Sequence, residues 1–227
     1  MRQLIVKALK CALKIFAEHK PLSKLNPRQA EAVKYIDGPL LVLAGAGSGK
    51  TSVITRKIAY LIEKCGYKAH HIAALTFTNK AAREMKERAT SLIKRKAARG
   101  LTVSTFHNLG MKIIGQEHKA LGYKKNFSIF DQSDALGIIK ELILQDSITE
   151  GEVDQAERYQ QLISDWKNDL IMPGHAISRA DDEEQAAAAR TYQGYQRLLQ
   201  AYNAVDFDDL IMVPALLFNE QPDILAR

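Results

Sequence analysis

The stretch Leu40–Thr51, LLVLAGAGSGKT, constrains this chain more than any other part of it. Its first five residues, Leu40–Ala44, are apolar without interruption, which predicts a strand buried on both faces, as in a parallel sheet. Gly45, Gly47 and Gly49 follow, and glycine accepts the conformations of a tight anion-binding loop without adding a Cβ. The sequence therefore predicts a phosphate-binding loop directly after a buried strand.

The residues after the loop complete the motif. Lys50 supplies a mobile cation for β- and γ-phosphates, and the Thr51 hydroxyl can bind Mg²⁺. The next segment, TSVITRKIAYLIEKCG, has helical apolar spacing and ends at Gly66. A helix that begins at such a loop points the positive end of its dipole at the phosphates. Together these features predict a P-loop that binds ATP and Mg²⁺.

Charge is distributed unevenly over the 227 residues, whose net charge is +6. Residues 25–107 carry fifteen Lys and Arg against five acids, whereas residues 108–227 carry eleven against twenty. The basic part favours a nucleic-acid partner and the acidic part a second structural unit, although ordinary solvated helix faces would give the same pattern.

The two cysteines form neither a disulfide framework nor a metal-ligand spacing, which predicts a reducing, cytoplasmic location. No apolar run reaches 18 residues, so no membrane partner is expected.

Residues 1–24 form a basic amphipathic pattern that ends near Pro21. Lysines break the apolar run and no small-residue cleavage site follows, so the pattern is not typical of a signal peptide. It predicts a surface helix or a non-native leader, with a transit peptide as a weaker alternative.

Gln29 precedes the P-loop strand by about ten residues. It lies in a predicted helix capped by Asn26 with Pro27 in its first turn. Its amide offers a donor and an acceptor, which suits an adenine edge.

The general P-loop pattern has glycine at the position of Ala44, so the stretch departs from that pattern by one residue. It fits A-x-x-G-x-G-K-T instead. With Gln29 before it, this pattern resembles the UvrD/Rep-type superfamily 1 DNA helicases, and most of all their Rep-type members. The resemblance implies these nucleotide-binding residues: Gln29, Ala44, Gly45, Ala46, Gly47, Ser48, Gly49, Lys50, Thr51 and Ser52, with Lys50 and Thr51 catalytic and Thr51 on the metal.

Two further segments carry the resemblance. The predicted strand His71–Thr76 runs into TFTNKAAREM, which is similar to motif Ia of that family and places Asn79 as a helix cap. The predicted strand Leu101–Ser104 runs into Thr105-Phe106-His107, which is similar to motif Ib. The family holds single-stranded DNA at these motifs, and an aromatic ring can stack on a base while hydroxyls and helix starts hold phosphate. The candidate DNA contacts are Phe77, Thr78, Asn79, Thr105, Phe106 and His107; a core Phe77 and a structural His107 are the alternatives.

Helical patterns follow from residue 107 to residue 204. They predict helices over His107–Gln116, from Asp131 or Ser133 to Leu144, over Glu152–Leu170 and over Ala180–Ala204. In them, Trp166 is expected to be a core residue. The segment Val205–Leu210, VDFDDL, resembles the point where the family's chain re-enters its RecA-like core, and its acids are expected to cap a helix rather than to bind a metal.

The resemblance covers residues 25–227 and implies an α/β fold, a RecA-like parallel sheet with a helical insertion. The expected domains are a basic extension at 1–24, the first part of the RecA-like domain at 25–107, the insertion at 108–200 and a return into the RecA-like domain at 201–227. The family's Asp-Glu-x-x-Asp strand, Walker B, does not occur in the sequence. We therefore expect the N-terminal part of a longer enzyme that is inactive alone.

The implied function is that of an ATP-dependent 3′–5′ DNA helicase in replication or repair. It would translocate on single-stranded DNA and unwind duplex junctions, with replication or repair proteins as further partners. Two alternatives stay open: a non-catalytic nucleic-acid-binding P-loop module, and a helicase-nuclease subunit of the AddA/RecB type.

Overall fold

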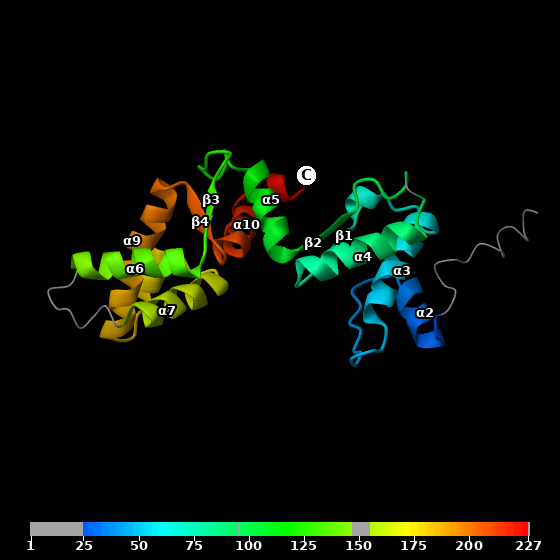
Figure 1. Cartoon of the computed structure of the whole chain (residues 1–227), viewed down its shortest axis with the longest axis horizontal. Helices are drawn as coiled ribbons and strands as arrows, with labels where there is room; N and C mark the ends of the chain where they lie inside the picture. The colour runs from blue at the N-terminus through cyan, green and yellow to red at the C-terminus, as the bar shows by residue number, and fades with distance from the viewer. Residues whose placement is uncertain (1–24, 95, 147–154, 227) are drawn as a thin grey trace, which may run out of the picture. The chain divides into compact units, whose positions relative to one another are not determined.

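The computed structural model describes residues 25–94, 96–146 and 155–226. It forms two compact units, which divide between Thr105 and Phe106 (Figure 1). The predicted basic extension at residues 1–24 lies outside the described residues. Among those that are described, no helix is long and apolar enough to cross a membrane.

The first unit combines helices with two parallel strands. Strands β1 and β2 pair in parallel from Ala73↔Thr102 to Thr76↔Thr105, and α4 packs against β2 and α3 (Figure 1). Their contact buries a core of aliphatic side chains. The elements of this unit are α2 (Pro27–Lys34), α3 (Lys50–Glu63), a 3₁₀ turn (Ala69–His71), β1 (Ala73–Thr76), α4 (Asn79–Leu92) and β2 (Thr102–Thr105).

The prediction of a buried strand over Leu40–Ala44 is wrong for this structure. No strand forms there, and Leu41 and Leu43 are 81% and 87% exposed. The apolar run shows that the segment suits burial on both faces, but a strand also needs backbone partners. Within the described residues, only β1 and β2 pair in this unit, and neither pairs with Leu40–Ala44.

The second unit is mainly helical and contains a second pair of parallel strands, β3 with β4. Helix α5 packs on α10, and α6 packs on α7 and α9 (Figure 1). Helix α8 packs on α9. The elements are α5 (Phe106–Gln116), β3 (Ser128–Phe130), α6 (Gln132–Asp146), α7 (Ala156–Asn168), α8 (Pro173–Ser178), α9 (Glu183–Ala201), β4 (Ala204–Asp206), α10 (Asp209–Glu220) and α11 (Pro222–Leu225).

The core of this unit is built around the helix α9. Tyr192, Tyr195 and Leu199 lie on one face of α9 and are at most 1% exposed. Trp166 packs against this core and stacks on Tyr192, with ring centroids 6.1 Å apart, so it is a core residue as predicted.

Several local predictions need correction. The side chain that caps α4 is Thr78, whose Oγ1 accepts from the Ala81 N–H; Asn79 is the first helical residue. The acidic half is not helical throughout, because β3 and β4 pair across more than 70 residues of sequence. The helix α8, with Pro173 in its first turn, was not predicted; proline is favourable at that position because its missing N–H is not needed there.

Candidate nucleotide-binding site

The loop between Ala44 and Lys50 contains glycines in conformations that an anion-binding loop requires. Gly47 and Gly49 have φ of +74° and +83°, in the left-handed region that favours glycine. A Cβ added at Gly45 or Gly47 would meet no atom within 4 Å. The Ser48 hydroxyl donates to the Gly45 carbonyl at 2.7 Å and steadies the turn. The loop therefore leaves room where a phosphate could approach its backbone.

Helix α3 begins directly at this loop. Its N-cap is Gly49, which offers no side-chain partner to the first N–H groups of the helix. Unpaired N–H groups and the helix dipole make such a terminus favourable for an anion. Thr51 and Ser52 lie in the first turn and are partly buried, and the Ser52 hydroxyl accepts from the Arg56 Nε at 3.2 Å.

The Lys50 side chain folds back over the loop. Its Nζ donates to the carbonyl oxygens of Ala44, at 3.0 Å, and Gly45, at 2.7 Å. Lys50 is exposed to solvent and has no carboxylate partner in the described part of the chain. The ammonium is therefore held at the loop by neutral acceptors, which an anionic ligand could replace.

Gln29 connects the first helix to the loop. Asn26 and Gln29 form a capping box, in which Gln29 Oε1 accepts from the Asn26 N–H at 3.0 Å. The other end of the amide, Nε2, donates to the Ser48 carbonyl at 2.9 Å. Lys57 of α3 donates to the carbonyls of Ala32 and Tyr35 and so fixes the end of α2. The fold thus brings Gln29, predicted from sequence, against the predicted P-loop.

These residues fit ATP with Mg²⁺ by their chemistry. The loop offers backbone N–H groups and open space, Lys50 a cation, and Thr51 a hydroxyl at the start of a helix. Hydroxyl and phosphate oxygens are the ligands that Mg²⁺ prefers. The assignment of these roles to each residue stays a prediction.

The candidate DNA contacts of the first unit lie between β1 and α4. Phe77 is 91% exposed, which excludes the alternative that it is a core residue of this unit. Thr78 and Asn79, at the start of α4, are exposed beside it. A ring that protrudes next to a helix N-terminus can stack on a base while the helix start holds phosphate.

The candidates of motif Ib divide at the boundary of the two units. Thr105 ends β2 and is 6% exposed, so its side chain offers little surface to a ligand. Phe106 is 50% exposed and His107 is also exposed, both in the first turn of α5. The His107 ring meets Phe207 edge to face, with centroids 6.0 Å apart.

Sequence reasoning missed a buried charged cluster in the second unit. Lys167 of α7 is completely buried, and its Nζ donates to Asp206 Oδ2 at 2.7 Å and to Asp209 Oδ1 at 2.8 Å. The Tyr195 hydroxyl donates to Asp206 Oδ2 at 2.8 Å, and the Lys167 ammonium lies 5.0 Å from the Tyr195 ring centroid. Asp206 and Asp209 of the VDFDDL segment therefore bind a lysine and tie β4 and α10 to α7.

Burial and charge shift the proton affinities of this cluster. Burial lowers the pKa of Lys167, but the carboxylates of Asp209 and Asp206 outweigh it and raise the pKa above its ordinary value. Burial raises the pKa of Asp209, although the positive charge of Lys167 acts to lower it. Burial and the Asp206 carboxylate also raise the pKa of the Tyr195 phenol. Burial is therefore the main cause of the shifts of Asp209 and Tyr195, whereas the neighbouring carboxylates cause that of Lys167.

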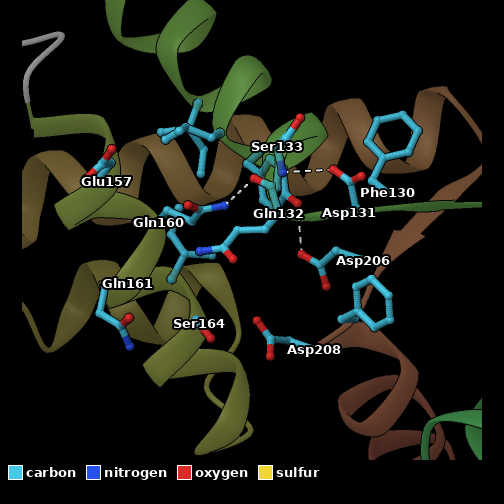
Figure 2. Close-up of a pocket in the computed structure, with 16 residues that line it drawn as sticks. Phe130, Asp131, Gln132, Ser133, Glu157, Gln160, Gln161, Ser164, Asp206 and Asp208 are labelled. Atoms are coloured by element: carbon cyan, nitrogen blue, oxygen red, sulfur yellow. Dashed lines mark hydrogen bonds between the residues drawn. The ribbon is translucent and has the colours of Figure 1, made fainter.

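A pocket of about 1030 Å³ lies beside the cluster, between α6, α7 and the ends of β3 and β4 (Figure 2). Many of its polar groups are used internally: Asp131 Oδ1 accepts from the N–H groups of Ser133 and Asp134, and Gln160 Nε2 donates to the Gln132 carbonyl. Among the described residues that line it, several are carboxylates and none is Lys or Arg. Carboxylates repel an anion, so this lining is unsuited to phosphate.

A glycine loop that opens a helix, with a lysine and a hydroxyl residue at its end, defines the P-loop class of nucleotide-binding proteins. The chain belongs to the UvrD/REP helicase family, because residues 25–227 match the family described as the UvrD/REP helicase N-terminal domain. It is 53% identical to the ATP-dependent DNA helicase Rep of Escherichia coli over 208 residues, which are 90% of this chain and 30% of that protein. It is 43% identical to the ATP-dependent DNA helicase PcrA of Leuconostoc citreum, over 89% of this chain and 27% of that protein. The chain thus spans about a third or less of the length of these relatives.

Proposed function

We propose that this chain is the N-terminal part of an ATP-dependent 3′–5′ DNA helicase that translocates on single-stranded DNA and unwinds duplex in replication or repair. The observation that carries the proposal is the contact of Gln29 with the loop that ends in Lys50 and Thr51. The relatives named as ATP-dependent DNA helicases support it. In the same proposal, residues 108–200 form a helical insertion between the two parts of a RecA-like domain.

At the nucleotide site, each residue would act by position and charge. The loop from Ala44 to Gly49 would cradle the phosphates with its N–H groups, and Ser52 would lie in the first helical turn behind them. Lys50 would leave its carbonyl partners and face the β- and γ-phosphates, while Thr51 would hold Mg²⁺. Bound ATP–Mg²⁺ would supply the phosphoryl group whose hydrolysis drives movement. Gln29 would hold the adenine edge with its amide.

Single-stranded DNA would contact each unit through its own motif. In the first unit, Phe77 would stack on a base while Thr78 and Asn79 would hold phosphate. In the second unit, Phe106 and His107 would provide the contact, next to Thr105 at the end of the first. Exposed rings accept any base, because every base has a stacking face. This fits an enzyme that moves along DNA of any sequence.

The 227-residue chain alone should bind ATP–Mg²⁺ weakly and hydrolyse it hardly at all. Phosphoryl transfer depends on a water-positioning acid and on arginine fingers, each acting with the phosphate cradle. The sequence holds the cradle but no Asp-Glu-x-x-Asp motif. Loss of an arginine finger alone lowers the rate by roughly 10³–10⁵ in related enzymes.

Calorimetric titration with ATP–Mg²⁺ should be paired with a phosphate-release assay, with and without oligo(dT). We expect nucleotide binding that Lys50→Ala weakens, together with turnover near background. DNA-stimulated turnover that Lys50→Ala abolishes would show a complete catalytic site in these residues. Absence of nucleotide binding would instead favour a non-catalytic module.

A further inference from the structure

Exposed cations gather at the edge of the first unit where the strands β1 and β2 begin. The segments that enter these strands, residues 64–71 and 94–100, contain no Asp or Glu. Their described Lys and Arg residues are all exposed. These residues, which we call the basic edge, are Lys64, Lys68, Lys94, Lys96 and Arg99.

Close contacts bring the two segments together. The Lys94 N–H donates to Glu63 Oε1, at the end of α3, over 3.3 Å. Gly100 has a φ of +90°, and a Cβ there would lie 2.9 Å from the Cβ of His70. Because β1 and β2 are parallel, the two segments also lead into the same edge of the sheet. The five cations therefore lie on adjoining segments of one surface.

The charges of the basic edge have no carboxylate partner among the described residues, because none of them takes part in an ion pair there. Lys64 and Lys94 follow the last turns of α3 and α4, where the helix dipole stabilises a cation. Lys68, Lys96 and Arg99 lie outside the α-helices, so the dipoles do not account for them. Clustered like charges repel one another, and an anionic ligand relieves that repulsion.

The basic edge lies away from the sites that the proposed function uses in this unit. Phe77 follows β1 and Thr105 ends β2, at the opposite ends of these strands. The four residues of β1 span about 13 Å, which separates the two edges of the sheet. The basic edge therefore suits a partner other than the nucleotide and the strand of DNA held at motif Ia.

The helix ends at this surface favour a polypeptide over a nucleic acid. Helices α3 and α4 both end here, and the last carbonyl groups of a helix lack intrahelical N–H partners. A polypeptide brings backbone N–H donors for such carbonyls. A phosphate offers acceptors only, and the negative end of a helix dipole disfavours it. Tyr67, between Lys64 and Lys68, is 49% exposed and adds a ring on which an apolar side chain can pack.

We propose that the basic edge binds an acidic segment of a partner protein, with an apolar or aromatic side chain of that segment on Tyr67. The carboxylates of the segment pair with the four lysines and Arg99, while its N–H groups bind carbonyls at the ends of α3 and α4. The surface is separate from the P-loop and from motifs Ia and Ib. The partner therefore binds without displacing nucleotide or single-stranded DNA.

The test measures binding of a fluorescent oligo-glutamate peptide by anisotropy, with the whole 227-residue chain at low ionic strength. The wild type should bind the peptide, and added salt should weaken the complex because it screens exposed ion pairs. The edge variant, which combines Lys68→Gln, Lys96→Gln and Arg99→Gln, should bind roughly 3-fold to 150-fold more weakly, the combined effect of three exposed ion pairs.

The matched control removes the same charge from exposed positions of the first unit outside the basic edge. It combines Arg28→Gln, Lys34→Gln and Lys86→Gln, and it should bind oligo-glutamate like the wild type. Circular dichroism should show that both variants are folded. If the two variants lost the same affinity, the peptide would respond to net charge alone and the inference would be wrong. A wild type that binds no oligo-glutamate would also overturn it.

A second peptide, with one phenylalanine among the glutamates, tests the contact with Tyr67. It should bind the wild type more tightly than oligo-glutamate does, because the two rings can pack together. Tyr67→Ala should remove this difference and leave binding of oligo-glutamate as it is. If both peptides bind the wild type equally, Tyr67 is not part of the surface and that part of the inference is wrong.

Binding of oligo(dT) separates this inference from the proposed function. The edge variant should bind oligo(dT) like the control variant, whereas Phe77→Ala should bind it more weakly than the wild type. If the edge variant lost more affinity for oligo(dT) than the control, the basic edge would be a nucleic-acid surface and the inference would be overturned. If only Phe77→Ala failed to weaken oligo(dT) binding, the proposed DNA contact would fail and the peptide surface would stand.

Discussion

Two lysines of this chain are used in opposite ways. Lys50 is exposed in the first unit, and its ammonium meets two neutral carbonyl oxygens. Lys167 is fully buried in the second unit, between two carboxylates and close to two tyrosine rings. Removing one partner of a buried ion pair leaves a buried charge without compensation, whereas an exposed ammonium can exchange its carbonyl partners for water. Lys50 is thus available to a ligand, whereas Lys167 is committed to the fold.

The surroundings of the two lysines differ in the same way. The P-loop is exposed, and Gly45 and Gly47 leave open space, so a ligand could bind there without displacing a packed side chain. The cluster around Lys167 joins elements that are 39 and 42 residues apart in the sequence. The same residue type can therefore serve a site or a core, and the surroundings decide which. Substitutions at each lysine and at the residues around it test whether this contrast holds.

The largest expected effect is that of Lys167→Met. This change leaves Asp206 and Asp209 buried without their cation, which should lower the free energy of unfolding by about 3–5 kcal/mol. Urea unfolding followed by the fluorescence of Trp166 measures it, because Trp166 lies next to Lys167 in the same core.

Lys50→Met is the matched control for this experiment. It makes the same chemical change at an exposed position and should alter stability by less than about 0.5 kcal/mol. Adding Asp206→Asn and Asp209→Asn to Lys167→Met should recover part of the loss, because no uncompensated charge remains. Equal effects of the two lysine changes would contradict the contrast between them.

The next effect concerns ligand binding at Lys50. Lys50→Ala should weaken ATP–Mg²⁺ binding by about 1.5–3 kcal/mol, the typical contribution of a hydrogen bond to a charged group. Calorimetric titration measures it, and Lys57→Ala is the control, because Lys57 binds carbonyls at the end of α2 away from the loop. Unchanged affinity in Lys50→Ala would mean that the ammonium stays on its carbonyl partners.

A third effect is loss of stability of the second unit in alkali. An unfolded tyrosine loses its proton near pH 10, but burial beside carboxylates raises the pKa of Tyr195 in the fold. Above pH 10 the folded chain therefore binds more protons than the unfolded chain, and stability falls as pH rises. The slope is about 1.4 kcal/mol per pH unit for each such group. Lys167, whose pKa is also raised, contributes in the same direction above its ordinary value of 10.5.

Tyr195→Phe isolates one group of this alkaline transition. It should cost about 1 kcal/mol at neutral pH, where the hydrogen bond to Asp206 is lost. Above pH 10 it should reduce the slope by about 1.4 kcal/mol per pH unit. An identical slope in Tyr195→Phe would show that this phenol does not carry the effect.

Much of the first unit could be predicted from the sequence because its signals are local. Asn26 caps the helix that begins with Pro27, as predicted, and Gly47 and Gly49 take the left-handed conformations that favour glycine. The strands predicted over His71–Thr76 and Leu101–Ser104 form as β1 and β2, each shifted by one or two residues.

The rest depends on contacts that sequence spacing does not show. The strand expected over Leu40–Ala44 needed partners that the described residues do not provide. The role of Lys167 depends on acids about forty residues away, although one signal was present. Tyr159, Ile163 and Lys167 follow at intervals of four along α7, which places the lysine on the buried face of that helix. A lysine on an apolar stripe, in a chain with a later run of aspartates, suggests a buried ion pair.

The smallest effect separates the two uses of Gln29, which serves the fold at one end of its amide and the site at the other. In Gln29→Glu, a carboxylate oxygen can still accept from the Asn26 N–H, as a capping box allows, so stability should change by less than about 0.5 kcal/mol. The donor to the Ser48 carbonyl is lost, so ATP–Mg²⁺ binding should weaken by roughly 1 kcal/mol. Gln29→Ala removes both contacts and should also cost about 1 kcal/mol of stability. If Gln29→Glu were as unstable as Gln29→Ala, the contact with Ser48 would belong to the fold. The difference between Lys50 and Lys167 would then be one of degree, because even the exposed loop would be held by contacts that the fold requires.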